Sequence, residues 1–136
     1  MIYVDANVPM YVVGDDASHK ADARRIVERL AGERRRFVTS CEVFQEILHR
    51  YVSIDRRDAI EPAFETLRGI VDEVLAVQEA DVFAAKDLVY AHRRLSARDA
   101  LHVAVMRRNE IAEVLSFDRG FDAMTGIRRL PATPSG

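Results

Sequence analysis

Short apolar runs alternate with amphipathic segments along the chain. Five runs rich in apolar and β-branched residues predict strands, the last of them a short edge strand: residues 2–4, 37–39, 74–77, 114–117 and 127–130. Between these runs apolar residues recur at helical spacing, which predicts helices after Asn7 and near residues 18–32, 40–51, 55–67, 80–92 and 96–106. Strands and helices that alternate at these lengths predict a doubly wound α/β fold around a central parallel sheet.

Polar residues mark the expected starts of four of these helices. Asn7, Ser40, Asp55 and Ser96 each precede or open an apolar helical pattern, and their side chains are good acceptors for free backbone N–H groups. Pro62 falls inside the segment that follows Asp55, and proline removes a backbone donor. We therefore expect that helix to be split or kinked.

Length and composition indicate one domain. The chain has 136 residues, 49% of them apolar, which suffices for one core. We expect a domain over residues 1–130 and a flexible tail over residues 131–136. A single cysteine, Cys41, excludes an internal disulfide. Asp5 interrupts the apolar N-terminus, and no stretch reaches the roughly 20 apolar residues of a membrane span, so the sequence predicts a cytoplasmic protein without a membrane segment.

Four acids suggest the chemistry of the chain. Asp5 and Asp118 each follow a predicted strand, Glu46 lies within a helix, and Asp99 begins another helix. Ligands of open α/β sheets bind outside the carboxyl ends of the strands, so these acids can meet at one sheet edge. Four converging carboxylates require a divalent metal. The alternative is that the acids only cap helices and turns, as the capping-box spacing of Ser96 and Asp99 illustrates.

Helical geometry distinguishes Glu46 from its neighbour Glu42. Each helical residue advances about 100° around the axis, which puts Glu42 roughly 170° from the centre of the apolar face and Glu46 roughly 130° from it, at the margin of the core. Glu46 is therefore the preferred candidate. The spacings Glu46-x-x-His49 and Asp99-x-x-His102 also occur in di-iron helix bundles, but the predicted strands argue against that fold.

Four short motifs together resemble PIN-domain ribonucleases, and most closely the VapC toxins of bacterial toxin–antitoxin pairs. They are Asp5-Ala6-Asn7, Thr39-Ser40 followed by Glu46, Ser96-Ala97-Arg98-Asp99-Ala100, and Ser116-Phe117-Asp118 followed by Phe121. The resemblance extends from Met1 to about Leu130 and implies a PIN-like three-layer α/β/α fold with a sheet of four to five strands. It makes Asp5, Glu46, Asp99 and Asp118 the catalytic acids, of which Asp5, Asp99 and Asp118 bind metal, with Asn7 and Ser116 in support. Asp122 is a second candidate for the role of Asp118.

The resemblance also implies an activity and partners. We expect an endoribonuclease toxin that uses Mg²⁺ or Mn²⁺ to activate water and hydrolyse RNA, with Arg98, His102 and Arg119 as possible substrate contacts. The implied partners are RNA, a small antitoxin that covers the site, and a second copy in a homodimer. Two alternatives are a non-catalytic RNA- or protein-binding module and a phosphatase with Asp5 as nucleophile. The phosphatase is disfavoured because Asn7 replaces its expected second acid.

Overall fold

A five-stranded parallel sheet forms the centre of the protein in the computed structural model, which describes residues 1–131. The strand order is β3-β2-β1-β4-β5. The strands span Ile2–Val4 (β1), Phe37–Ser40 (β2), Glu73–Leu75 (β3), Glu113–Leu115 (β4) and Arg128–Leu130 (β5). The predicted α/β fold with a parallel sheet is therefore confirmed. The tail predicted at residues 131–136 lies, apart from Pro131, outside the described residues, so the boundary at residue 130 stays a prediction.

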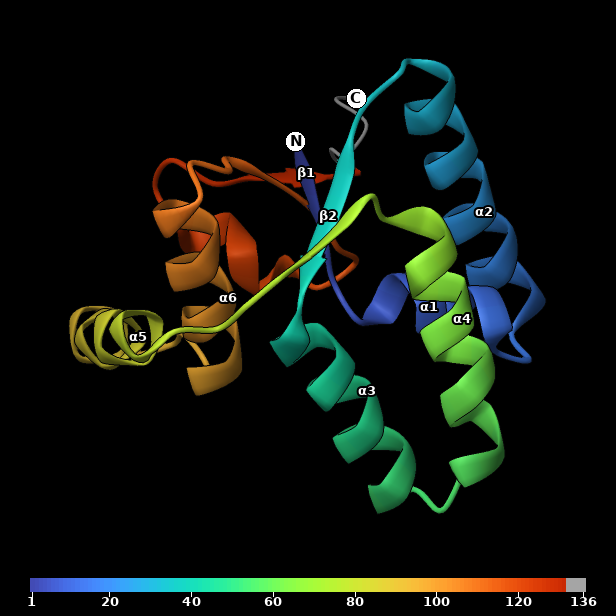
Figure 1. The fold of residues 1–136 in the computed structure, drawn as a ribbon, viewed down its shortest axis with the longest axis horizontal. Coiled ribbons are helices and arrows are strands. Elements are labelled where there is room, and N and C mark those ends of the chain that lie inside the picture. Colours follow the sequence, from blue (N-terminus) through green and yellow to red (C-terminus); the bar gives the residue numbers. More distant parts are fainter. Residues whose placement is uncertain (132–136) are drawn as a thin grey trace.

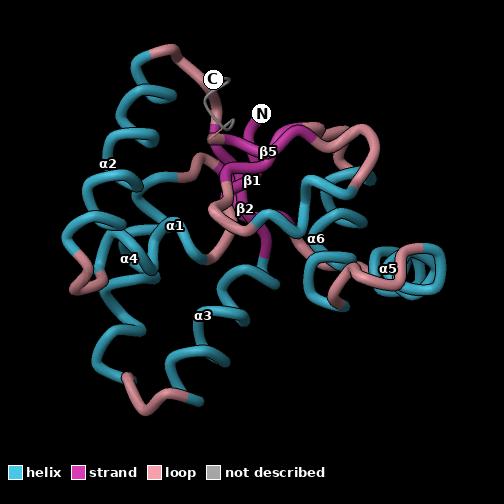
Figure 2. Tube along the Cα trace, turned by 180° about the vertical axis from the view of Figure 1, so that it is seen from behind, coloured by secondary structure: helices cyan, strands magenta, loops and turns pink. Residues whose placement is uncertain are grey.

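Helices cover both faces of the sheet. On one side lie α5 and α6, which pack against each other, and on the other lie α1, α2 and α4, with α3 next to α4 (Figures 1 and 2). The bounds are Asn7–Val13 (α1), Ala17–Gly32 (α2), Cys41–Ser53 (α3), Ile60–Ile70 (α4), Glu79–Ala91 (α5) and Ala97–Arg108 (α6), with 3₁₀ helices at Arg57–Ala59 (η1) and Arg119–Ala123 (η2). Within residues 1–131, no helix combines the length and the apolar character that crossing a membrane requires.

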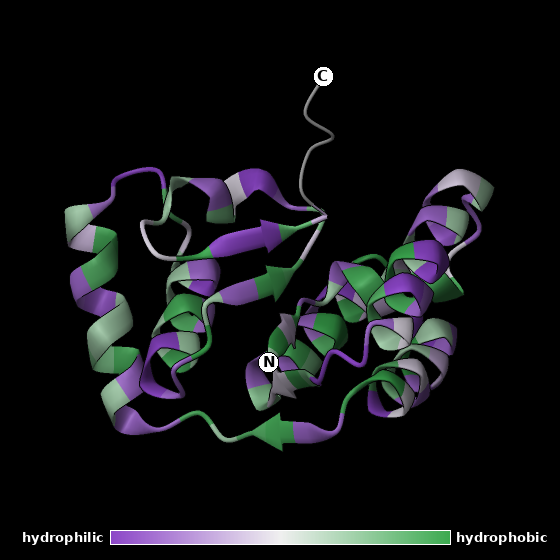
Figure 3. Ribbon diagram, turned by 90° about the horizontal axis from the view of Figure 1, so that it is seen from above, coloured by the Kyte–Doolittle hydropathy of each residue, from purple (hydrophilic) through white to green (hydrophobic). Residues whose placement is uncertain are grey.

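The centre of the sheet is also the centre of the core. All three residues of β1, Ile2, Tyr3 and Val4, are fully buried, because the strand has β2 and β4 on its two sides and helices on both faces. Burial decreases toward the sheet edges. Figure 3 shows the edge strand β5 as largely hydrophilic, since it begins with Arg128 and Arg129. Whatever follows β1 along the chain thus emerges from the most deeply buried part of the molecule.

The segment predicted as one helix after Asp55 begins differently from the expectation. Asp55 does not cap a helix, because its φ of 55° places it in the turn that follows α3. The segment is split as expected, into η1 and α4, but the division lies before Ile60. Pro62 falls in the first turn of α4, where backbone N–H groups have no intrahelical partner, so it does not break that helix. The strands β3 and β4 end two residues earlier than predicted, at Leu75 and Leu115.

Candidate active site

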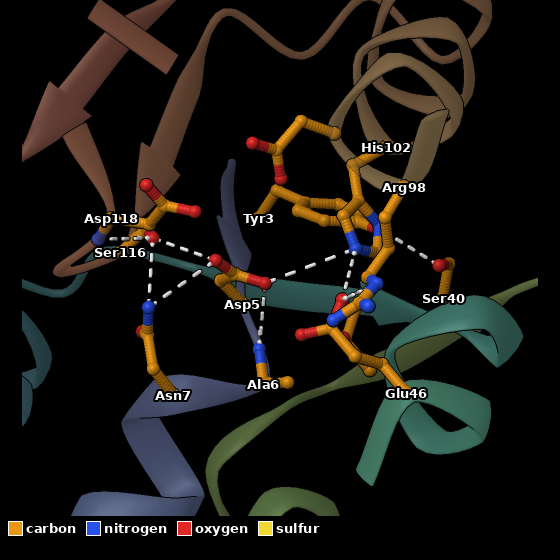
Figure 4. A network of polar contacts seen from close by, with 12 residues as sticks. Tyr3, Asp5, Ala6, Asn7, Ser40, Glu46, Arg98, His102, Ser116 and Asp118 are labelled. Carbon is orange, nitrogen blue, oxygen red and sulfur yellow. Dashed lines mark hydrogen bonds and ion pairs between the residues drawn. The ribbon is translucent and has the colours of Figure 1, made fainter. Parts of the chain in front are cut away.

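The register of the two central strands brings distant residues together. β1 and β4 are parallel neighbours, with Val4 opposite Leu115, so Asp5 and Ser116 leave the sheet at the same edge. The Asp5 N–H still donates to the Leu115 carbonyl at 3.0 Å. Ser116 Oγ donates to Asp5 Oδ2 at 2.6 Å (Figure 4). Asp5 therefore lies at the carboxyl edge of the sheet, as its position directly after a strand predicts.

Asp5 is held from three sides. Beyond the Ser116 hydroxyl, its carboxylate accepts a hydrogen bond from the Ala6 N–H at 2.8 Å and a longer one from Asn7 Nδ2 at 3.5 Å. Asn7 also donates to Ser116 Oγ at 3.2 Å, and its own Oδ1 accepts the Phe117 N–H. Asn7 makes no capping bond to α1, which it was expected to cap. Burial raises the pKa of Asp5, although the nearby His102 and the Ser116 hydrogen bond act to lower it.

Asp99 is the acid with a free carboxylate. It lies in the first turn of α6, where its N–H donates to Ser96 Oγ at 3.0 Å, so Ser96 caps the helix as predicted. Within residues 1–131 nothing donates a hydrogen bond to the Asp99 carboxylate, and the return half of the expected capping box is missing. Burial raises its pKa to about 6, and the charges of Asp118 and Asp5 add to the rise. The side chain is thus poorly stabilised without a cation.

Asp118 approaches from the loop after β4. Its N–H donates to Ser116 Oγ at 3.0 Å, and its Oδ1 accepts the Gly120 N–H at 2.9 Å, which forms an Asx turn. A Cβ atom on Gly120 would lie 2.6 Å from Asp99 Oδ2 and 3.3 Å from Asp118 Oδ1. Glycine therefore leaves room for two carboxylates side by side.

Glu46 reaches the same place from α3 and is held by a buried chain of polar groups. His102 Nε2 lies 3.1 Å from Glu46 Oε1 and 3.8 Å from Asp5 Oδ1. On its other side, His102 Nδ1 lies 2.7 Å from the Tyr3 hydroxyl, which is 2.6 Å from Ser40 Oγ (Figure 4). Ser40 thus contributes to this chain and makes no capping bond to α3.

The burial of His102 corrects its expected role. Its side chain has no exposed surface, so direct contact with a substrate is not available to it. Burial acts to lower its pKa, but the Glu46 hydrogen bond and the charges of Asp5, Glu46 and Asp99 outweigh burial and raise it. His102 is a positioning residue for Glu46. The sequence contains a weak signal of this polar network, because Tyr3 and Ser40 place hydroxyl groups in fully buried strands.

The four acids surround one cavity of about 380 Å³. It is lined by Asp5, Asn7, Met10, Tyr11, Glu46, Arg50, Ser96, Arg98, Asp99 and Asp118. Glu42 is not among these residues, in agreement with the preference for Glu46. Arg98 lies beside Glu46, with 3.7 Å between Nε and Oε1.

Two other candidates lie outside this cavity. Arg119 lines a neighbouring hollow instead. Asp122 forms an ion pair with Arg129 at 2.8 Å, so its carboxylate is already neutralised. The structure therefore gives Asp122 no part in the acid cluster.

The donor set fits a hard divalent cation. Four carboxylates converge on one cavity, and one of them, Asp99, has free oxygens and a raised pKa. Mg²⁺ and Mn²⁺ prefer such oxygen ligands. Ligand atoms of Asp5, Glu46 and His102 also lie within 4.8 Å of one another, but the imidazole Nε2 is already engaged with Glu46. We therefore favour the carboxylates as the metal ligands.

Residues 2–127 match the sequence model of the PIN domain. The chain belongs to the PIN-domain family. Over 130 residues it is 53% identical to ribonuclease VapC13 of Mycobacterium tuberculosis, a match that covers 96% of this chain and 99% of that protein. Over 118 residues it is 38% identical to ribonuclease VapC23 of the same organism, covering 87% of this chain and 93% of the relative. These matches place this PIN-domain protein among the VapC ribonucleases.

Solved structures share the PIN-domain fold. Mycobacterium tuberculosis VapC20, a toxin that cleaves the Sarcin-Ricin loop, superposes with a TM-score of 0.69 at 22% identity, over 90% of this chain and 94% of that one. VapBC2 of Rickettsia felis, solved with a promoter DNA fragment, gives 0.71 at 13% identity over 95% and 97% of the two chains. At these identities the similarity concerns the fold.

Proposed function

We propose that this protein is a metal-dependent endoribonuclease toxin that hydrolyses RNA phosphodiesters and is inhibited by a cognate antitoxin in the cytoplasm. The observation that carries the proposal is the cavity with four carboxylates, one of which has no hydrogen-bond donor within the described part of the chain. The identity with VapC13, named a ribonuclease, supports RNA as the substrate. A cluster of acids that only capped helices would have its carboxylates on backbone N–H groups, and Asp99 lacks that contact.

In this proposal Asp5, Asp99 and Asp118 hold Mg²⁺ or Mn²⁺, and Glu46 completes the acid set. Such a cation, when bound, lowers the pKa of a water ligand and offsets the charge of the phosphate. Ser116 and Asn7 keep the Asp5 carboxylate in one orientation through the hydrogen bonds at 2.6 and 3.5 Å. Water attacks the phosphorus and the bond to the 3′-oxygen breaks, which leaves 5′-phosphate and 3′-hydroxyl ends.

Three further residues in or beside the same cavity have supporting roles in this proposal. His102 holds Glu46 through its Nε2–H and leaves the second carboxylate oxygen of Glu46 to the site. Arg98 and Arg50, both on the cavity wall, are suited to bind a phosphate through their guanidinium groups. A phosphatase that uses Asp5 as nucleophile is disfavoured, because Asn7 stands where such an enzyme has its second acid.

Cleavage of RNA by the purified chain tests this function. The protein, free of any partner, is incubated with total RNA and Mg²⁺ or Mn²⁺, beside EDTA and Asp5→Asn controls, and the new 5′ ends are sequenced. We expect discrete cuts with 5′-phosphate ends that disappear in both controls. Products with 2′,3′-cyclic phosphate would instead show attack by the RNA 2′-hydroxyl and contradict the mechanism. Binding without cleavage would assign the chain to the non-catalytic alternative.

A homodimer and an antitoxin complete the proposal. The support is that similar folds occur in VapBC toxin–antitoxin complexes, among them those of Rickettsia felis and of Salmonella typhimurium. Light scattering of the purified chain measures the mass of the assembly, and co-expression with a candidate small antitoxin protein tests for inhibition. A stable complex in which RNA cleavage is lost would support inhibition, and a monomer that no candidate inhibits would contradict it.

A further inference from the structure

A second hollow, next to the acid cavity, is lined by basic side chains. It has a volume of about 290 Å³, and its wall includes His92, Arg93, Arg94 and Arg119. The first three belong to the connection between α5 and α6, and Arg119 begins η2. Segments that are about 25 residues apart in sequence thus bring guanidinium groups to this one basic hollow.

The basic side chains of this hollow have no acidic partner among residues 1–131. Within residues 1–131 none of its basic side chains forms an ion pair or a hydrogen bond with an acid, whereas Arg108 and Arg129 each lie 2.7 or 2.8 Å from a carboxylate. All four basic residues of the hollow are exposed. Several guanidinium groups without partners at one hollow favour an anionic ligand.

The basic hollow shares a wall with the acid cavity. Gly120 lines the hollow, and the position of its missing Cβ is 2.6 Å from Asp99 Oδ2. Leu95 lines the hollow and Ser96 the acid cavity, and Arg119 follows Asp118 directly. An anion in the basic hollow is therefore a close neighbour of any group held at the acids.

We infer that the basic hollow binds a backbone phosphate of the RNA strand, next to the phosphate that is cut. This inference rests on the proposed function. When the phosphate that is cut lies at the acids, the neighbouring phosphate of the same RNA strand lies one nucleotide away, beside the basic hollow. Arg98 and Arg50 lie on the wall of the acid cavity itself, so basic side chains are available both at the acids and in the hollow beside them. The planar fork of arginine binds two phosphate oxygens at once.

The test measures RNA binding by a chain that cannot cut. In an Asp5→Asn background with Mg²⁺, the double variant Arg93→Gln/Arg94→Gln and the single variant Arg119→Gln are titrated with a fluorescent single-stranded RNA across a range of salt concentrations. The matched control is Arg24→Gln/Arg57→Gln, which removes the same charge at two exposed arginines. These arginines line neither the acid cavity nor the basic hollow and have no ion-pair partner within residues 1–131.

We expect both variants of the basic hollow to bind RNA roughly tenfold more weakly. The salt dependence of log K should fall by about 0.7 for each phosphate that the variant no longer binds. The control should change neither quantity, and all chains should melt within a few degrees of one another. In the active chain the same substitutions should raise KM and leave kcat largely unchanged.

The outcomes separate this inference from the proposed function. If the active chain cuts RNA, while the variants of the basic hollow bind as the control does, the inference is wrong and the function stands. If the active chain neither cuts nor binds RNA, the proposed function fails, and the inference fails with it. If the variants of the basic hollow bind RNA normally but no longer bind the antitoxin, the inference is also wrong. The hollow would then be a binding site for an acidic protein segment.

Discussion

Asp99→Asn removes the charge of an acid whose ionised form the folded protein destabilises. The folded chain raises the pKa of Asp99 from 3.8 to about 6, with burial as the largest cause. This rise corresponds to about 3 kcal/mol of stability that the ionised side chain removes from the metal-free protein. The destabilisation is absent well below pH 3.8, where the carboxyl is protonated in both folded and unfolded chains. It grows as the pH rises toward 6 and is complete above that value.

The neutral amide that Asp99→Asn introduces avoids that destabilisation. In EDTA at pH 7.5 the variant should therefore melt roughly 10 °C above the wild type, and the difference should shrink to about 2 °C at pH 4. Added Mn²⁺ should stabilise the wild type and leave the variant unchanged. RNA cleavage by the variant should fall at least 100-fold, because the metal loses a principal ligand. Thermal melts at the two pH values, with and without Mn²⁺, provide the measurement.

A matched control and a clear refutation complete this test. Asp87→Asn removes a carboxylate that is 76% exposed on α5, and it should alter neither melting nor cleavage. If Asp99→Asn instead lowers the melting temperature in EDTA, the Asp99 carboxylate stabilises its helix, and the reasoning from its free oxygens is wrong. Full metal-dependent cleavage by the variant would equally refute the assigned ligand.

Three further substitutions test separate parts of the structure. Gly120→Ala brings a methyl group to 2.6 Å from an acid oxygen, so cleavage should fall roughly 100-fold while melting changes little. Asp81→Asn breaks the ion pair with Arg108 that joins α5 to α6 and that holds the pKa of Asp81 below its usual value against the effect of burial. Urea unfolding should therefore show a loss of about 3 kcal/mol in the free energy of unfolding at pH 7, and the loss should shrink at acid pH. The control Asp87→Asn should show a change near zero. His102→Gln should lower kcat about 10- to 100-fold with KM unchanged, because the residue holds Glu46 and does not touch RNA. A raised KM would contradict that positioning role.

Sequence reasoning succeeded where one local pattern determines position. The apolar run before Asp5 predicts a buried strand, and a residue that ends a central parallel strand must emerge at the sheet edge where ligands bind. The helical wheel favoured Glu46 over Glu42 in the same way. A residue at the margin of the apolar face lies beside the core, and Glu46 lines the acid cavity there. These positions depend on periodicity alone.

Other assignments failed because each side chain has several candidate partners. Asn7 and Ser40 are good caps by residue type, but in the fold nearer partners at Ser116 and Tyr3 take their side chains. His102 is buried and contacts Tyr3, which is 99 positions away, and no local pattern contains that information. Arg119 as a substrate contact stays a prediction, but its place in the basic hollow and not in the acid cavity depends on how η2 lies beside the α5–α6 connection, which the sequence does not show.

The hydrogen bond between Ser116 and Asp5 has a consequence for protein synthesis. It joins residues 111 positions apart, and β1 obtains its neighbour β4 only when residues 113–115 have been made. A ribosome adding about 5 to 20 residues per second needs roughly 5 to 20 s to cover that stretch. A chain still in translation therefore has Asp5 without Ser116 or Asp118, and a nuclease built in this way completes its acid set only after residue 118 has been made. Until then the growing chain lacks the complete site with which it could cut the message that encodes it.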